Sequence, residues 1–265
     1  MKIFLVALVL VTTAINANAQ TTQRAIFPEN DLHLDKTTRM SRITKEVFDK
    51  LLITVMHQYR RLTVTSNLSL SISGDWENEK VNAYAAQRMH VDNGNGRRTK
   101  VARITILGGI ARHPDITLDA LALVVCHEVG HVLGGAPYIK GRDVRVSSEG
   151  QSDFYAARYC MEKLVDKLPA SAAPVSGMAQ FVCEGRWFDN PNMNNKCKRI
   201  AAAGEALAGL LAKISRVATP EIDTPDMTVV GETLYNSYPS AQCRLDTYVA
   251  GATWQPRPAC WYAGD

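Results

Sequence analysis

Two histidines and a glutamate stand close together in the apolar segment LVVCHEVGHVLGG, residues 123–135, as His127, Glu128 and His131. Residues four apart on an α-helix lie one turn apart on the same face, so both imidazoles can reach a single ion. Glu128 adjoins the first histidine, where its carboxylate can approach a water held by that ion. His-Glu-x-x-His indicates a zinc hydrolase, but it also occurs by chance, so the rest of the chain decides its meaning.

A third metal ligand is available a short distance downstream. Glu149 opens the segment EGQSDFYAARYC, and Asp153 follows it by one helical turn. Two neutral imidazoles and one carboxylate would leave zinc an open fourth position and lower the pKa of its bound water to roughly 7. Asp153 could hold the far nitrogen of a ligand histidine. Two plainer interpretations stay open: Glu149 as an acid stabilised by the helix dipole, and Asp153 as a solvated helix residue.

Two helices must position these side chains. A helix over residues 117–133, with Thr117 as its N-cap, would carry both histidines, and the glycine pair 134–135 would end it. One of the two serines at 147–148 can cap a second helix that reaches about residue 168. The apolar residues around the histidines are what a buried metal-binding helix requires.

The remaining elements predict an α+β, zincin-like fold with a small antiparallel sheet packed on these two helices. Alternating apolar residues and turn signals predict three strands, at residues 68–73, 81–91 and 100–107, with a hairpin turn starting at Asp92. Helical spacing predicts two further helices, at residues 38–62 and 197–217. The third strand directly precedes the histidine helix. We therefore expect it at the edge of the cleft, where it could bind an extended substrate by β-augmentation.

The start of the chain has the features of a signal peptide. Lys2 is followed by an apolar run over residues 3–11, and Ala17-Asn18-Ala19 matches a cleavage site. The mature chain would begin at Gln20, and no later stretch is long and apolar enough for a transmembrane segment. We expect an exported protein, periplasmic or extracellular.

Composition and length are those of one globular domain. The chain has 265 residues and a formal net charge of +4, with basic residues scattered among acids, so nucleic acid is not an expected partner. After the signal peptide 1–19 we expect one domain, 20–265. It would have a helical N-terminal segment (20–64), a catalytic core (65–168) and a cysteine-rich C-terminal part (169–265) that completes the site.

An even number of cysteines in an exported chain predicts disulfide bonds. The six are Cys126, Cys160, Cys183, Cys197, Cys243 and Cys260. Sequence does not choose among their possible pairings. Four lie after residue 180, so we expect the C-terminal part to be cross-linked. Cys126 points away from the histidine face and should be either buried or bridged to that part.

Four segments resemble the HtpX-like gluzincin peptidases, in family order. These are VNAYA (81–85), the stretch from Ile104 to His131, SSEGQSDFYAARYC (147–160) and YPSAQCRLDT (238–247). The resemblance spans about residues 65–165 and a short piece near 240. It implies one zinc ion held by His127, His131 and Glu149, with Glu128 as the general base in peptide-bond hydrolysis.

The fourth segment departs from the family, because Tyr238 stands where a histidine is usual. A tyrosine hydroxyl could donate to an oxyanion, or Tyr238 could be a packed aromatic residue. The resemblance implies that Arg244 positions the substrate or supports the zinc glutamate; the alternative is a surface arginine.

We therefore expect an exported zinc endopeptidase whose partner is a protein or peptide substrate. The alternatives are a catalytically silent binding or structural protein with the same fold, and a zinc amidase acting on cell-wall material.

Overall fold

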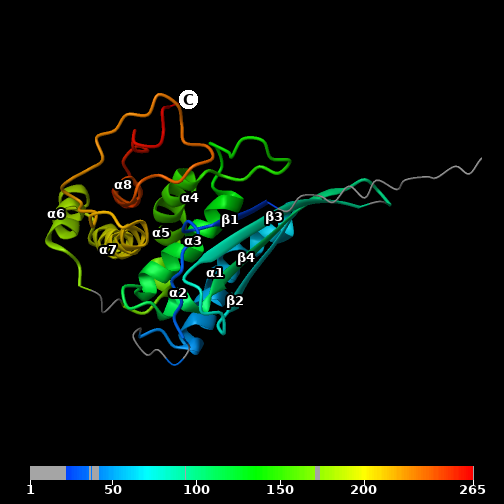
Figure 1. Ribbon diagram of the computed structural model, residues 1–265, viewed down its shortest axis with the longest axis horizontal. Helices are drawn as coiled ribbons and strands as arrows, with labels where there is room; N and C mark the ends of the chain where they lie inside the picture. Colours follow the sequence, from blue (N-terminus) through cyan, green and yellow to red (C-terminus); the bar gives the residue numbers. More distant parts are fainter. Residues whose placement is uncertain (1–21, 36, 38–41, 93, 171–173, 265) are drawn as a thin grey trace, which may run out of the picture.

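The structure is a computed structural model that describes residues 22–35, 37, 42–92, 94–170 and 174–264 (Figure 1). The expected signal peptide, residues 1–19, lies outside the described residues. The fold is α+β: a four-stranded sheet lies on one side of the molecule, and most of the helices lie on the other. No helix among the described residues is long and apolar enough to cross a membrane.

The sheet is mixed, which corrects the expectation of an antiparallel one. Its strands are β1 (Thr22–Ala25), β2 (Leu68–Asp75), β3 (Ala83–Val91) and β4 (Arg98–Leu107), in the order β1-β3-β4-β2. β4 forms a hairpin with β3 and lies between β3 and β2, so it runs antiparallel to β3 and parallel to β2. Alternation in the sequence predicts which side chains share a face, but not which strands are neighbours.

The strand expected at the cleft edge is an interior strand. β4 is paired along its length on both sides, so the prediction that it binds a substrate strand is wrong. The edges of the sheet are β1 and β2. β1 arises from a segment, residues 20–36, that looks polar and irregular in sequence, and it pairs antiparallel with β3.

Helix α1 (Lys45–Thr65) is capped by Thr44 and packs on β2. It starts later than residue 38; of the residues before it, 38–41 lie outside the described residues, and 42–44 are not helical. The short α2 (Gly108–Arg112) follows β4 and leads to α3 (Leu118–Leu133), which Thr117 caps as predicted.

The helix expected over 147–168 runs without a gap from Glu149 to Lys167, but its type changes along the way. It comprises α4 (Glu149–Tyr155), a π-helical turn (Ala156–Cys160), α5 (Met161–Leu164) and a 3₁₀ turn (Val165–Lys167). The helix predicted from Cys197 begins earlier, as α7 (Pro191–Ser215), with Asn190 as N-cap. The short α2 was not predicted, and neither were α6 (Gly177–Arg186) and α8 (Ala241–Thr253).

Helix α3 lies at the centre of the core (Figure 1). Every residue from Asp119 to Val132 is buried, because the helix contacts β3 and β4 on one side and α4 and α7 on the others. A helix that is apolar on nearly all sides needs such surroundings. Its polar residues His127, Glu128 and His131 are therefore held inside the protein rather than on its surface.

Three disulfide bonds connect all six cysteines. Cys183–Cys197 and Cys243–Cys260 lie in the C-terminal part, which confirms that this part is cross-linked. Cys126 is buried, which is one of the two alternatives expected for it, and it pairs with Cys160 in the π-helical turn rather than with the C-terminal part. This bond joins α3 directly to the helical segment that begins at Glu149.

Candidate metal centre

Three buried side chains converge at one point between α3 and α4. Their possible ligand atoms, from His127, His131 and Glu149, all lie within 4.8 Å of one another. The Nε2 atom of His127 is 3.3 Å from Oε2 of Glu149, and Nε2 of His131 is 3.6 Å from Oε1. None of the three is exposed to solvent. This cluster could hold a metal ion.

Hydrogen bonds at the far side of each imidazole determine which nitrogen can bind a metal. Nδ1 of His131 is 2.8 Å from the carbonyl oxygen of Ser147, and Nδ1 of His127 is 2.7 Å from Oδ1 of Asp153. Both oxygens are acceptors, so each Nδ1 carries a hydrogen and donates it. Each Nε2 therefore faces Glu149 and, once deprotonated, can offer its lone pair to a metal ion, as metal-binding histidines do.

Unsatisfied polar atoms support the fit to a metal. Among the described residues, the buried atoms without a hydrogen-bond partner include Nε2 of both histidines, Oε2 of Glu149 and both oxygens of Glu128. A buried polar atom without a partner is costly, and native proteins rarely keep one without a reason. Here the unsatisfied atoms belong to neighbouring side chains, and a bound cation with an attached water would satisfy them together. The residues present therefore fit a divalent metal ion.

Asp153 is the centre of a buried hydrogen-bond network with α8. Arg244 donates from Nε to Oδ2 and from Nη2 to Oδ1, both at 2.7 Å, and the hydroxyl of Tyr248 donates to Oδ1 at 2.6 Å. Although burial would raise the pKa of Asp153, Arg244 and His127 hold it well below its usual range. Asp153 is thus a buried carboxylate that contacts a ligand histidine, and not a solvated helix residue.

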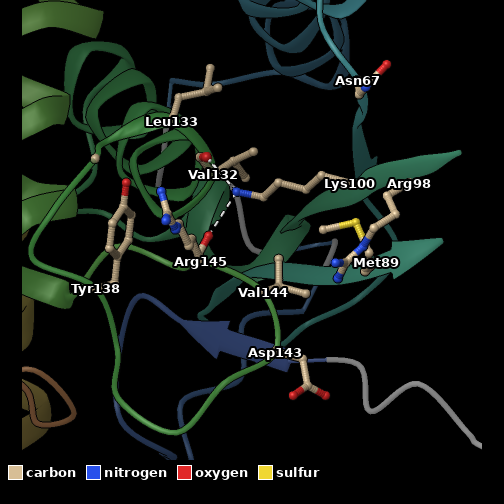
Figure 2. A pocket seen from close by; sticks show the side chains of 11 residues that line it. Asn67, Met89, Arg98, Lys100, Val132, Leu133, Tyr138, Asp143, Val144 and Arg145 are labelled. Carbon is tan, nitrogen blue, oxygen red and sulfur yellow. Dashed lines mark hydrogen bonds between the residues drawn. The ribbon is translucent and has the colours of Figure 1, made fainter. Parts of the chain in front are cut away.

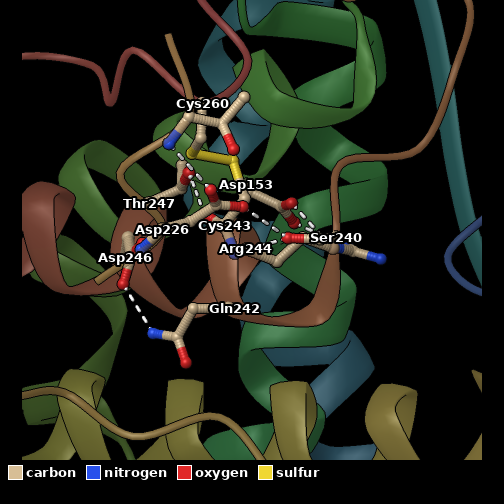
Figure 3. The surroundings of a disulfide bond; sticks show 10 residues. Asp153, Asp226, Ser240, Gln242, Cys243, Arg244, Asp246, Thr247 and Cys260 are labelled. Atoms are coloured by element: carbon tan, nitrogen blue, oxygen red, sulfur yellow. Dashed lines mark hydrogen bonds and ion pairs between the residues drawn. A yellow bond between two sulfur atoms is a disulfide. The ribbon is translucent and has the colours of Figure 1, made fainter. Parts of the chain in front are cut away.

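Arg244 is fully enclosed, which excludes the surface interpretation. No hydrogen bond joins it to Glu149 among the described contacts; its guanidinium holds Asp153 and the carbonyl oxygen of Ile26, 2.7 Å from Nη1. The adjacent disulfide, Cys243–Cys260, lies beside this network in Figure 3 and fixes α8 to the chain's C-terminal segment.

The glutamate among the three ligands has an arginine partner that sequence analysis did not identify. Nε of Arg24, on β1, donates to Oε1 of Glu149 at 2.9 Å. Burial would raise the pKa of Glu149, but His131, His127 and Arg24 lower it to about 2. Glu149 is therefore ionised, and it is not a solvated acid at a helix start. Arg24 and Glu149 are 125 residues apart in the sequence, so no local pattern predicted their contact.

Glu128 is fully buried and interacts electrostatically with His127 and Glu149. Burial raises its pKa to about 8, and nearby Glu149 adds to this effect. A carboxyl group whose pKa lies near neutrality can both accept and return a proton, as a general base requires.

Tyr238 lies at the outer side of the site, where its hydroxyl donates to the carbonyl oxygen of Ala25 at 2.7 Å. Its ring also contacts the guanidinium of Arg24, 5.4 Å from the ring centroid. Burial raises the pKa of the phenol, so the hydroxyl keeps its proton and acts as a donor. The ring of Tyr238 is therefore packed and half-buried, and its hydroxyl is a hydrogen-bond donor.

Close contacts between backbones set the distance between α3 and α4. A Cβ atom at Gly130 would lie 2.7 Å from the carbonyl oxygen of Ser152, so only glycine allows this approach. The Ser152 hydroxyl in turn lies 2.9 Å from Nδ1 of His131. On the other side of α4, the ring of Trp261 packs where a Cβ of Gly150 would stand. Together with the Cys126–Cys160 bond, these contacts bring the third ligand to the histidines.

Beyond the C-terminal end of α3 lies an open pocket of about 610 Å³, lined by residues of β3, β4 and the loop after α3 (Figure 2). Nζ of Lys100 donates to the carbonyl oxygens of Val132 and Arg145, at 2.8 and 2.9 Å. Lys100 thereby ties β4 to the end of the helix that carries the histidines. The metal ligands are not among the pocket's lining residues.

Comparison with known proteins gives no further guidance. Neither the models of protein families, nor the curated proteins, nor the solved structures contain a match to this chain. The function must therefore be argued from the geometry of His127, Glu128, His131 and Glu149 and from the residues that hold them.

Proposed function

We propose that this protein is an exported, zinc-dependent endopeptidase of the HtpX-like gluzincin type, with a zincin-like fold. The observation that supports this most strongly is the convergence of three unsatisfied ligand atoms, from His127, His131 and Glu149, beside an unsatisfied carboxyl group, Glu128. Two imidazoles and one carboxylate are a frequent ligand set of catalytic zinc. Zinc bound here would polarise a substrate carbonyl and lower the pKa of a water to roughly 7.

The protein's own residues have separate tasks in this proposal. Glu128 takes a proton from the attacking water and gives it to the leaving amine. Arg244 and Tyr248 fix the carboxylate of Asp153, which holds His127 in the tautomer that presents Nε2. The hydroxyl of Tyr238 stays protonated and can donate to a developing oxyanion when Ala25 is not its partner. Arg244 is buried and acts through Asp153, so it is a positioning residue.

The location in this proposal is outside the cytoplasm. Three disulfide bonds fit a periplasmic or extracellular protein, because thiols are kept reduced in the cytosol. The cleavage pattern at Ala17-Asn18-Ala19 supports the same location. N-terminal sequencing of the exported protein tests it, with Gln20 as the expected first residue.

One observation favours a second candidate, a zinc-binding protein without turnover. The side chains of His127, Glu128, His131 and Glu149 have no exposed surface, so a substrate cannot reach them in this conformation. A structural zinc site is closed in the same way, although it usually has four protein ligands rather than three. The three-ligand set therefore favours the enzyme.

The deciding experiment combines metal analysis with an activity assay. Elemental analysis of the purified protein should give about one zinc per chain, as expected for a mononuclear site. Casein and peptide libraries should be cleaved by the wild type and not by Glu128→Gln, whereas Glu184→Gln, at an exposed position on α6, should keep full activity. Zinc without cleavage would support the binding protein. Folded protein that takes up no zinc would refute the metal site itself.

A further inference from the structure

The metal centre is closed by a segment of its own chain. The candidate ligands have no solvent-exposed surface, whereas Arg24 and Ala25 of β1 and Tyr238 are half-buried, contact one another and reach Glu149 through Arg24. In Figure 1, β1 lies along the free side of β3, next to α3 and α4. A molecule approaching Glu149 from the sheet side would meet β1 first.

β1 is bound to β3 as a short antiparallel strand. Thr22–Ala25 pair with Gln87–Tyr84, and the amide of Ile26 donates to the carbonyl oxygen of Ala83 at 3.2 Å. Hydrogen-bonded pairs alternate along an antiparallel ladder, so Arg24 faces Ala85 in the next hydrogen-bonded pair. The peptide groups of β1 thus occupy the backbone positions of β3 that a substrate strand would use.

Two further contacts join β1 to residues assigned to the reaction. Arg24 donates to Oε1 of Glu149, a proposed metal ligand. The carbonyl of Ala25 accepts the hydroxyl of Tyr238, the proposed oxyanion donor. The carbonyl of Ala25 therefore already accepts the hydrogen bond from Tyr238 that a substrate carbonyl would need. In the same way, the guanidinium of Arg24 already binds one carboxylate oxygen of Glu149.

We propose that β1 is an internal substrate-like strand that keeps the site closed, and that an extended peptide must take its place on β3. This inference rests on the proposed peptidase function. Among the described residues, only the four of β1 need to move: Gln23 is exposed, whereas Ile26 and Phe27 are fully buried and anchor the segment at its C-terminal end. A short edge strand with few buried side chains is among the first elements of a fold to open.

A cross-link tests whether opening is required. Gln23 and Ala86 face each other in a non-hydrogen-bonded pair, where Cα atoms are about 4.5 Å apart, close enough for a disulfide. The double variant Gln23→Cys/Ala86→Cys, with the bond verified by peptide mapping, holds β1 on β3. Gln23→Ser/Ala86→Ser is its matched control. We expect the cross-linked protein to lose peptide cleavage and to release zinc to a chelator at least about tenfold more slowly than the control, because opening is blocked.

A second variant tests release. Arg24→Ala removes the charge-assisted bond to Glu149, and this loss should raise the open population about tenfold. Faster zinc release to the chelator, faster hydrogen exchange at the Ala85 and Gln87 amides, and a higher kcat/KM are the expected results. Arg103→Ala, at an exposed position on β4, should match the wild type in all three measurements.

The two proposals fail in different ways. If no variant cleaves any peptide, the peptidase function is refuted, while zinc release and hydrogen exchange still report whether β1 covers the metal. If the cross-linked protein cleaves peptides and releases zinc as fast as its serine control, β1 is not a closure and the inference is wrong. The inference is also wrong if Arg24→Ala leaves exchange at Ala85 and Gln87 unchanged.

Discussion

Replacing Asp153 with asparagine should destabilise the protein and weaken metal binding at the same time. The substitution keeps the shape of the side chain but removes the charge that faces Arg244, whose guanidinium is buried with 1% of its surface exposed. Loss of one partner from a buried ion pair costs about 3–5 kcal/mol, because the other charge is left uncompensated. Global stabilities are only about 5–15 kcal/mol, so this is a large fraction.

The same substitution also takes the carboxylate partner away from His127, because a neutral amide oxygen replaces the charged oxygen next to Nδ1. Losing such a partner typically lowers metal affinity about 10- to 100-fold. Denaturant unfolding of the metal-free variant measures the first effect, and zinc competition with a chelator of known affinity measures the second. Arg244→Met is the companion variant, and Asp153→Asn/Arg244→Met is the double variant. Because the double variant leaves no uncompensated charge, it should lose clearly less stability than the sum of the two single losses.

The stability result can contradict the reasoning in two ways. If Asp153→Asn lowered the free energy of unfolding by less than about 1 kcal/mol, the pair would contribute no more than an exposed ion pair does. Arg244 would then have another partner that compensates its charge. Additive losses in the double variant would mean that Asp153 and Arg244 do not depend on each other, despite the 2.7 Å contacts between them.

Three further predictions concern the packing and protonation of the site. Gly130→Ala should lower the free energy of unfolding by about 1–3 kcal/mol through overpacking against the backbone of α4, and it should weaken zinc binding. Gly209→Ala is the control, because its Cβ would meet open space, and it should stabilise α7. Equal unfolding midpoints for the two variants would contradict the packing argument. Cys126→Ala/Cys160→Ala should lower the unfolding free energy by about 2–4 kcal/mol, measured by denaturant titration, and an unchanged value would refute a bracing role for this bond. In the metal-free protein, burial would lower the pKa of His127, but the carboxylate of Asp153 raises this pKa to about 9. Zinc binding at pH 7 should therefore release at least about one proton and strengthen as pH rises toward 9; calorimetry in buffers of different ionisation enthalpy tests this, and uptake without proton release would contradict it.

Sequence predicted the local parts of the site well. Thr117 caps α3 as expected, and the helical repeat that places His127 and His131 on one face depends only on residues close in the chain. Asp153 stands one turn after Glu149 on the same helix, so its presence near the site also followed from spacing. Roles in catalysis remain predictions, because geometry brings the residues together without testing their activity.

Contacts between distant segments could not be predicted in this way. Periodicity in β4 indicates which side chains are buried, but not that β2 and β3 lie on either side of it. Arg24 reaches Glu149 across 125 residues, and no local pattern marks it among the other arginines. Tyr248 offered a weak signal, since it stands four residues after Arg244 on the face of α8 that contacts Asp153.

The charges around the candidate ligands explain why Glu128 would need a bound metal ion to act as the proposed base. Glu149 and Asp153 are ionised, and each negative charge is matched by an arginine, Arg24 or Arg244. These four charges sum to zero, and without an ion the attraction of the nearby His127 does not outweigh burial, so the pKa of Glu128 rises to about 8. With a divalent ion bound, the same carboxyl group would be favoured in its ionised form, because a nearby cation stabilises a carboxylate. With β1 in place, the closed site would then keep a net charge of about +1. In the closed site the two arginines would thus leave the full charge of the ion available to Glu128, rather than to the residues that hold it.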